Sequence, residues 1–412
     1  MRVLLHENSA DGHRLSYLAY FLPELLSLTP DVTIALPRCD ADSPEFDVWL
    51  QPFKDRITID AFDTGNVQFR PRTPIQRSHF LLQAIRRSRA QHVYIPSAYG
   101  VSHTHALYPP AIFSRGYETE VGVLRGGFAY PVPPLLSLKH RLALSLLRAS
   151  RWNVLHFIDV IAYRHLLARG GNLARRARLL PDPVERTPET SKSAARRALG
   201  IPEDGRYVAS TGTLTARKGI RLLLHAFQHA KLRPTDRLLL TGKCDVEIRA
   251  LVDGPYAPLL RSGRVILFDR YLEQHELPLT LSAADLVATP YMGHVGVASI
   301  VIRAASIGRP IVANDSGWIG SIVSGLGLGT TCAPEPDAFT AHLPRALDLA
   351  ETHAPSPASR RLAKFHDIPN FSACLAARLR ERLERPPATH LRSWDWVLTG
   401  ENAAPTESPS PH

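Results

Sequence analysis

The sequence predicts an α/β protein built from two doubly wound domains. Its 412 residues are enough for two domains that each bury a core, and hydrophobic residues make up 44% of the chain. Strand-like and helix-like segments alternate along both halves, as they do where helices cover a parallel sheet. In the second half, two glycine-containing loops follow predicted strands, and ligands of open α/β sheets bind at such places.

The first half begins with a strand, a polar loop and a helix. Residues 1–5 suit a buried strand, and Leu15 to Leu26 have apolar residues at helical spacing. Leu155–Leu167 suits either a helix or a strand. Further strands are predicted at Val32–Leu36, His92–Ile95, Val121–Leu124 and Leu179–Val184. We therefore expect a first domain over 1–183 and a linker over 184–205, in which Pro188–Ala198 suits a linker or an exposed helix.

The second half repeats the alternation more clearly. Six strands are predicted, at Tyr207–Ser210, Arg237–Thr241, Val265–Phe268, Leu286–Thr289, Pro310–Ala313 and Gly329–Cys332. We expect a second domain over 206–370, then C-terminal helices over 371–398 that are able to cross back to the first domain. The Pro- and Ser-rich end, 399–412, is expected to be disordered.

The excess positive charge belongs to the first half. Residues 1–200 contain 26 Lys and Arg against 17 Asp and Glu, whereas residues 201–412 contain 23 against 21. Such an imbalance suits nucleic acid, an anionic membrane or a phosphorylated substrate. The basic residues show no recurring aromatic platform, zinc-finger spacing or RNA-recognition signature, so we expect no nucleic-acid partner.

Cysteine spacing and hydropathy bear on the compartment. Cys39, Cys244, Cys332 and Cys374 form no CxxC motif, which favours a reducing environment. No apolar run has the length of a membrane span, and no signal peptide is evident. We expect a cytoplasmic protein.

Two cations lie in the first glycine-bounded loop. The predicted strand Tyr207–Ser210 leads into Thr211–Gly219, which carries Gly212, Arg217 and Lys218 before a helix from Ile220 to Ala230. Arginine and lysine beside a helix start suit a diphosphate. A solvated basic turn would show the same residues.

A second loop strengthens the diphosphate hypothesis. After Leu286–Thr289 the chain reads Pro290 to Ser299, with Gly293 and Gly296, and then continues as a helix to Ile307. The free N–H groups of that helix start would face an anion at the same sheet edge as Lys218.

With these loops in place, the second half resembles the donor domain of GT-B glycosyltransferases, most closely family 4 (group 1). The resemblance covers about residues 205–345. It rests on four segments, namely Gly212 to Gly219, Leu239 to Gly242, Ala284 to Pro290, and Ala304 to Gly317. It implies the GT-B fold, two Rossmann-like domains facing across a cleft. It also implies transfer of a sugar from a nucleotide diphosphate-sugar donor with retention of configuration, the donor being a substrate, with no cofactor and no metal.

The resemblance assigns roles to individual residues. Lys218 falls on the lysine that neutralises the donor diphosphate, and Arg217 supplies the second cation because Thr213 stands where many members have arginine. We therefore expect Lys218 and Arg217 to be catalytic, together with His13 and Arg125 of the first half. The other expected donor-binding residues are Gly12, Gly212, His294, Gly296, Val297, Ser299 and Arg303. For His294 the alternative is a solvated loop histidine, and Tyr271 and Tyr291 suit either the donor's border or rim packing.

The chain departs from the family at a pair of glutamates. These positions hold Val295 and Arg303. The family's second glutamate accepts hydrogen bonds from the donor ribose, and a guanidinium only donates them. Arg303 therefore either binds phosphate oxygens or an acidic sugar, or lies outside the site. Its i, i+4 spacing from Ser299 places both on one helix face.

The first half is expected to hold the acceptor. Gly12 lies where the family has a glycine-rich loop, and His13 begins the helix expected to face the cleft, although Asp11 would equally suit a simple helix cap. Arg125, followed by Gly126 and Gly127, stands where many relatives have a histidine that contacts the transferred sugar; a tight turn explains the glycines as well. Ser97, Tyr99, His103 and His105 are further acceptor-side candidates.

The stretch 135–152 has the pattern of a basic amphipathic helix. Leu135, Leu138, Leu142, Leu146 and Ala149 share one face, and Lys139, Arg141, Arg148 and Arg151 lie mostly elsewhere. The favoured interpretation is a helix that covers the sheet with its leucines. The alternative is peripheral contact with an anionic membrane.

We therefore predict a cytoplasmic glycosyltransferase that is independent of metal, with an unknown acceptor. Two other functions stay open. One is a sugar-nucleotide or glycan binder that no longer catalyses, and the other is a nucleotide-sugar epimerase-like enzyme.

Overall fold

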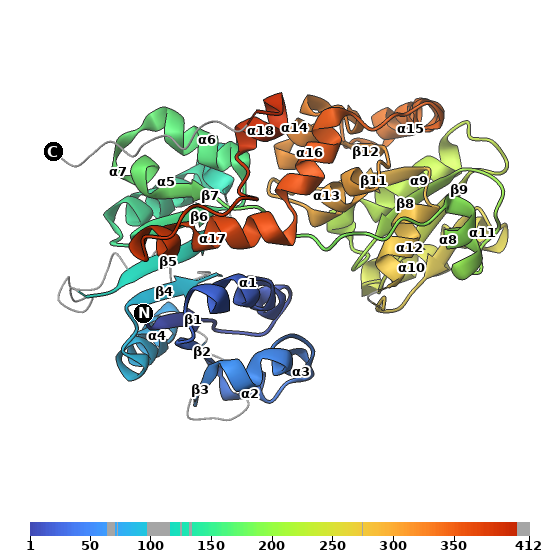
Figure 1. Ribbon diagram of the computed structural model, residues 1–412. Helices are drawn as coiled ribbons and strands as arrows, with labels where there is room; N and C mark the ends of the chain where they lie inside the picture. Colours follow the sequence, from blue (N-terminus) through green and yellow to red (C-terminus); the bar gives the residue numbers. More distant parts are fainter. Residues whose placement is uncertain are drawn as a thin grey trace. The chain divides into compact units, whose positions relative to one another are not determined.

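A computed structural model describes residues 1–63, 71, 73–96, 116–123, 126–131, 134–273 and 275–401. The chain divides into two compact units, each built on its own sheet (Figure 1). Unit 1 comprises Met1–Pro183 and Ile368–Arg392, and unit 2 comprises Val184–Asp367 and Ser393–His412. None of the helices within these described ranges has both the length and the hydropathy to span a membrane.

Unit 1 is a doubly wound, all-parallel sheet of seven strands in the order β3-β2-β1-β4-β5-β6-β7. The strands are β1 Val3–His6, β2 Val32–Pro37, β3 Thr58–Phe62, β4 His92–Ile95, β5 Glu118–Val123, β6 Val154–Phe157 and β7 Ala177–Leu179. The helices are α1 Arg14–Leu28, α2 Arg38–Ala41, α3 Pro44–Trp49, α4 Pro74–Ser88, α5 Pro134–Ala149, α6 Val160–Arg169, α7 Gly171–Arg176 and α17 Ile368–Arg382. The strand order reverses between β1 and β4.

Alternate residues of β1, β2 and β4 enter cores on opposite faces of this sheet. In β1, Val3 and Leu5 pack with α1, α3 and α17, whereas Leu4 packs with α4 to α7. Helix α17, drawn in red in Figure 1, belongs to unit 1 although it comes late in the chain. Its Phe371 is fully buried beside Tyr17 of α1.

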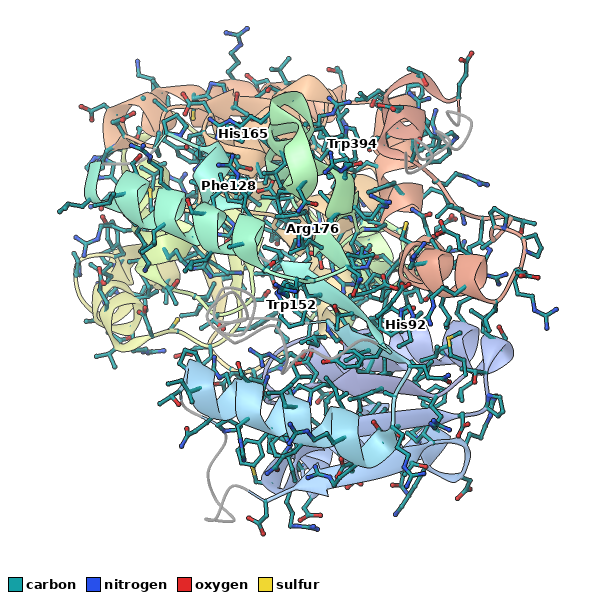
Figure 2. The ribbon with its side chains drawn as sticks, turned by 90° about the vertical axis from the view of Figure 1, so that its left-hand side faces the viewer. His92, Phe128, Trp152, His165, Arg176 and Trp394 are labelled. Carbon is teal, nitrogen blue, oxygen red and sulfur yellow. The ribbon has the colours of Figure 1, made fainter. Side chains whose placement is uncertain are left out.

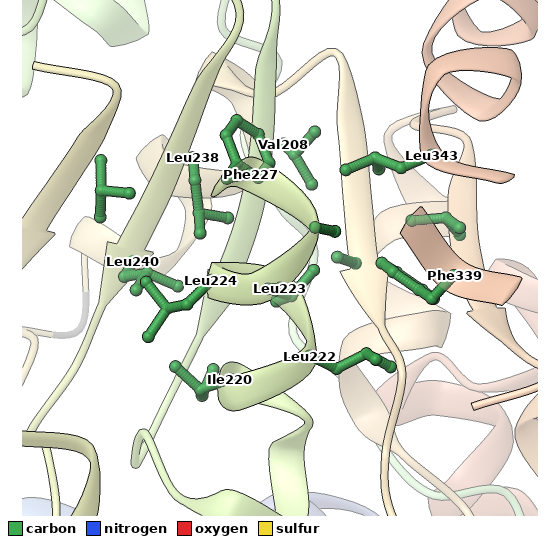
Figure 3. Close-up of a cluster of buried hydrophobic side chains, with 14 of the residues drawn as sticks. Val208, Ile220, Leu222, Leu223, Leu224, Phe227, Leu238, Leu240, Phe339 and Leu343 are labelled. Atoms are coloured by element: carbon green, nitrogen blue, oxygen red, sulfur yellow. The ribbon is translucent and has the colours of Figure 1, made fainter. Parts of the chain in front are cut away.

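Unit 2 repeats this plan with six parallel strands in the order β10-β9-β8-β11-β12-β13. The strands are β8 Tyr207–Thr211, β9 Arg237–Thr241, β10 Val265–Phe268, β11 Leu286–Thr289, β12 Ile311–Asn314 and β13 Gly329–Cys332. The helices are α8 Lys192–Ala198, α9 Ile220–His229, α10 Val246–Asp253, α11 Ala257–Arg261, α12 Glu276–Ala283, α13 Ser299–Ser306, α14 Gly317–Gly325, α15 Pro336–Glu351, α16 Pro357–Phe365 and α18 Trp394–Thr399. Figure 3 shows the core, in which α9 lays Leu223 and Phe227 against Val208 and Leu238, with Phe339 of α15 beside them.

Two details differ from the sequence expectation. The strand expected at Leu179–Val184 is wrong, because β7 ends at Leu179 and Val184 instead makes an isolated bridge to Asp367. Pro181 and Pro183 have no N–H group to continue the ladder. The segment Leu155–Leu167 contains both alternatives, β6 and then α6, with Asp159 as the N-cap between them.

The segment 184–205 contains helix α8, which packs on α12. Its Arg196 is buried and donates to the carbonyl oxygens of Ala283 and Glu203 and to the carboxylate of Asp285. These contacts make α8 a structural part of unit 2.

Candidate active site

The candidate site lies at the carboxyl edge of the unit 2 sheet. The strand order reverses between the neighbouring strands β8 and β11, and ligands of open α/β sheets bind outside such a switch point. The two loops singled out in the sequence, Gly212–Gly219 and Pro290–Ala298, follow these two strands. The fold therefore brings the two predicted phosphate-binding loops to one place.

Two glycines make this close approach possible. Gly212 has φ +92°, and a Cβ atom there would lie 2.5 Å from Nζ of Lys218. Gly219 has φ +73°, and its Cβ would lie 2.2 Å from the carbonyl oxygen of Pro290. Any side chain at Gly219 would thus push the two loops apart, while one at Gly212 would occupy the place of the ammonium group.

Lys218 carries a largely desolvated positive charge. Its ammonium donates a hydrogen bond to the carbonyl oxygen of Thr211 and lies 5.5 Å from the ring centroid of Tyr291. Burial, helped by the nearby positive charge of Arg217, lowers the pKa of Lys218 to about 8. Within the described part of the chain no carboxylate forms an ion pair with it, so the site favours an incoming anion.

Arg217 extends this positive group toward solvent, and His294 lies beside it. Arg217 is exposed, lies 5.8 Å from the centroid of Tyr291, and approaches Nδ1 of His294 at 3.4 Å. Nε2 of His294 lies 3.3 Å from the carbonyl oxygen of Val297. A neutral ring with its proton on Nε2 satisfies both contacts, and burial indeed lowers the pKa of His294.

The ring of Tyr291 lies beside both cations, Arg217 and Lys218. It is buried, and this burial raises the pKa of its hydroxyl to about 12. Its main chain is held by Asn314, whose amide donates to the Tyr291 carbonyl, and the next residue, Met292, donates from its N–H to the carbonyl of Arg217 at 2.7 Å. Tyr291 is therefore packed against the charged groups, and its place at the donor's border stays a prediction.

The glycine-rich loop presents the start of α13. Ala298 is the N-cap residue, and no side chain caps the helix. Val295 accepts a hydrogen bond from the N–H of Trp318 at 2.9 Å, and a Cβ at Gly317 would lie 2.9 Å from Cα of Val295. The loop is thus braced by the segment after β12, leaving Gly296, Val297 and Ser299 at the helix start, where an anion is favoured.

Arg303 lies on the same helix, one turn after Ser299. Both residues are half-buried. Within the described ranges no hydrogen bond or ion pair engages the guanidinium of Arg303, although its carbonyl accepts from Ser306 at 2.7 Å. An unpaired, half-buried guanidinium is suited to an anionic ligand, but its role stays a prediction.

Unit 1 has its own polar cluster at the carboxyl end of β1, next to its switch point. His6, Glu7 and Asn8 are buried, and neither ring nitrogen of His6 nor the amide of Asn8 has a hydrogen-bond partner among the described residues. Burial lowers the pKa of His6 to about 4. These residues are not among those predicted from the sequence, because their one sequence signal is a polar run directly after a buried strand.

Gly12 and His13, the described candidates in this part of unit 1, are exposed. Gly12 has φ +68° in the loop, and His13, not Asp11, is the N-cap residue of α1, without a side-chain hydrogen bond of its own. Arg125 and the candidates Ser97, Tyr99, His103 and His105 lie outside the described residues. Tyr271 is exposed after β10. In the part of the chain that the structure describes, no three His, Cys, Asp or Glu side chains form a metal-ligand group.

Residues 205–348 match the family described as Glycosyl transferases group 1. The resemblance predicted from the sequence is therefore confirmed over this segment. TuaC of Bacillus subtilis (strain 168), which is named as a teichuronic acid biosynthesis glycosyltransferase, is 27% identical over 135 residues. That match covers 32% of this chain and 31% of TuaC, so the chain matches about a third of the length of this relative.

Solved structures are similar across both units. Anabaena HepE in complex with UDP and glucose is 16% identical, covers 92% of this chain and 100% of its own, and has a TM-score of 0.64. Sucrose-phosphate synthase of Thermosynechococcus elongatus is 15% identical, covers 93% of this chain and 99% of its own, and has a TM-score of 0.70. The chain has the GT-B fold of these proteins, as predicted.

Proposed function

We propose that this protein is a glycosyltransferase that takes a sugar from a nucleoside diphosphate donor bound by unit 2. The observation that carries the proposal is the desolvated ammonium of Lys218, which has no carboxylate partner among the described residues and lies between two loops at the switch point. The group 1 match over 205–348 and the UDP complexes of HepE support a nucleotide-sugar donor.

The chemical step follows from the charge that develops in it. When the bond between sugar and diphosphate breaks, negative charge grows on the leaving phosphate. Lys218, Arg217 and the N–H groups at the start of α13 would stabilise this charge more in the transition state than in the ground state. A bound diphosphate would also raise the pKa of Lys218 from about 8, so the lysine would be charged when it is needed. Retention of configuration rests on the family resemblance.

The acceptor would bind in unit 1. The buried, unpaired His6 and Asn8 lie at the carboxyl edge of that sheet, where ligands of open α/β sheets bind. The spacing of the four cysteines, which forms no CxxC motif, supports a reducing, cytoplasmic compartment.

We also propose that the reaction needs no metal ion or cofactor, since side chains and a helix start supply the positive charge. Turnover should then survive chelation by EDTA. Loss of turnover that magnesium or manganese restores would contradict this proposal.

A non-catalytic nucleotide-sugar binder is the second candidate, favoured by Val295 and Arg303 at the family's glutamate positions. The deciding experiment screens UDP-, GDP- and ADP-sugars by thermal shift and then follows the donors that bind. Release of nucleoside diphosphate together with a glycosylated product shows transfer, and an epimerised nucleotide sugar shows the epimerase-like alternative. Binding with no product would identify the binder.

A further inference from the structure

Helix α5 packs on unit 1 with a different face from the one expected. Leu144 and Leu147 are buried in the core with Trp152 and Phe157. The stripe of Leu135, Leu138 and Leu142 is instead 86%, 65% and 61% exposed. Leu138 and Leu147 are nine residues apart, about 180° around the helix axis at roughly 100° per residue. The predicted packing of these leucines on the sheet is therefore wrong, and they point away from the core.

The helix is held in this orientation at both ends. At its C-terminal end, Arg176 donates hydrogen bonds to the carbonyl oxygens of Leu147 and Arg148 and, at 2.7 Å, to that of Ser150. In Figure 2 the labels Trp152 and Arg176 mark this end of α5. Toward the other end, His140 lies so close to Gly127 that a Cβ there would be 2.9 Å from its ring. These contacts oppose a rotation that would bury the exposed leucines.

The surroundings of the stripe are positively charged. Lys139, Arg141 and Arg148 are exposed on the same helix. Residues 134–181 contain nine Lys and Arg and a single acidic residue, Asp159. Asp159 is buried, caps α6 and accepts a hydrogen bond from Tyr130 at 2.7 Å. No acidic side chain of this segment is therefore available to neutralise the surface.

We propose that the stripe of Leu135, Leu138 and Leu142, flanked by these cations, docks unit 1 on the surface of an anionic lipid bilayer. The leucines would enter the boundary between headgroups and acyl chains, and Lys139, Arg141 and Arg148 would contact lipid phosphates. Nucleic acid suits the surface less well, because single strands stack on aromatic side chains and Trp152 and Phe157 of this segment are buried.

The test is co-sedimentation of the full chain with vesicles of phosphatidylcholine alone or with phosphatidylglycerol added. We expect binding to the anionic vesicles that weakens with salt. The double variant Leu138→Gln, Leu142→Gln should lose affinity by roughly 100-fold, and Arg141→Gln with Arg148→Gln by about tenfold or more. Val246→Gln, at a position 88% exposed on α10 of unit 2, is the control for the leucine variants. Lys54→Gln in unit 1 is the control for the arginine variants. All variants should unfold at the wild-type temperature.

Three results would overturn the proposal. The first is equal binding to neutral and anionic vesicles, and the second is equal vesicle affinity of the leucine variants and the controls. The third is a wild-type dimer that becomes monomeric in the leucine variants, which would make the stripe a contact between two copies of the chain. Vesicle binding requires neither donor nor turnover. A protein that does not bind vesicles could therefore still transfer sugar, and a protein without transferase activity could still bind vesicles.

Discussion

At the scale of single residues, the site depends on Lys218, whose ammonium group the fold largely desolvates. The sequence pattern suggests an exposed loop lysine, whereas the structure places its ammonium under Gly212 and against Tyr291. Lys218→Ala should lower transfer by about 100-fold or more. The free energy of unfolding should stay the same or rise slightly, because the substitution removes a desolvated charge. Arg217→Ala should reduce donor affinity less, since Arg217 is exposed.

The same lysine predicts a pH dependence. Donor affinity should fall as pH rises through about 8, because free Lys218 then loses its proton. Calorimetric titration across this range measures it, and Lys218→Ala should lack the step. Lys243→Ala, which removes an exposed lysine paired with Asp269 at 3.3 Å, is the matched control. A step of equal size in the Lys218 variant would assign the titration to another group.

Arg303 tests the departure from the family. If its unpaired guanidinium binds the donor, Arg303→Glu should weaken donor binding by roughly tenfold or more, since a carboxylate would repel the diphosphate. Titration of both forms with the best donor measures this. Lys231→Glu reverses an exposed charge elsewhere in unit 2 as a control. Equal affinity would place Arg303 outside the site, and tighter binding by the glutamate form would mean a degraded transferase.

At the scale of elements, the predictions from sequence succeed where one signal decides. In unit 2, β9, β10 and β11 are rich in apolar residues and have the predicted bounds, as does β13. The strand β3 was not predicted, because polar Thr58 and Asp60 interrupt it and no apolar run marks it. In the structure Thr58 is exposed and Asp60 pairs with Arg87. The site loops are predictable because their glycines and cations directly follow predicted strands, whereas the burial of Tyr291 and the unpaired His6 depend on contacts between distant segments.

Three strands of unit 1 share a buried charged cluster, which makes a prediction about stability. Glu120 of β5 is hydrogen-bonded to His92 of β4 at 2.6 Å and to His156 of β6 at 2.7 Å, and Arg382 of α17 lies 3.2 Å from the other nitrogen of His92. Burial alone would raise the pKa of Glu120, but the hydrogen bonds from His156 and His92 outweigh it and hold the pKa at about 2.

The folded-state pKa of Glu120 is below its ordinary value of 4.5, so its contribution to stability is present above that pH and is lost as pH falls toward about 2. Glu120→Gln should cost about 3 kcal/mol at neutral pH, since it breaks a buried charged cluster. Urea unfolding measures the cost. Glu247→Gln, which breaks an exposed pair with Arg221, should cost less than about 1 kcal/mol. Similar losses in the two variants would argue against the cluster.

At the scale of the whole molecule, the chain leaves unit 1 at Pro183 and returns to it at Ile368. Helix α17, which completes the core of unit 1, therefore follows most of unit 2 in the sequence. Tyr94 of β4 donates to the carbonyl of Leu375 at 3.1 Å, Ser372 donates to the carbonyl of Tyr20 at 2.9 Å, and Arg380 pairs with Glu24 at 2.6 Å. Helix α17 thus supplies an apolar face and polar anchors that residues 1–183 lack.

This discontinuity predicts that a substitution in α17 destabilises unit 1 and spares the donor site. Phe371→Ala removes a fully buried ring that meets Tyr17 edge-on at 5.4 Å between ring centroids. It should lower the free energy of unfolding by about 3–5 kcal/mol. Leu349→Ala on α15, 45% exposed, is the control and should cost under about 1 kcal/mol. Chemical denaturation gives the free energies, and calorimetry under native conditions should find wild-type donor affinity in both variants, because Lys218 and α13 belong to unit 2. Loss of donor binding by a folded Phe371 variant would show that the donor site depends on unit 1.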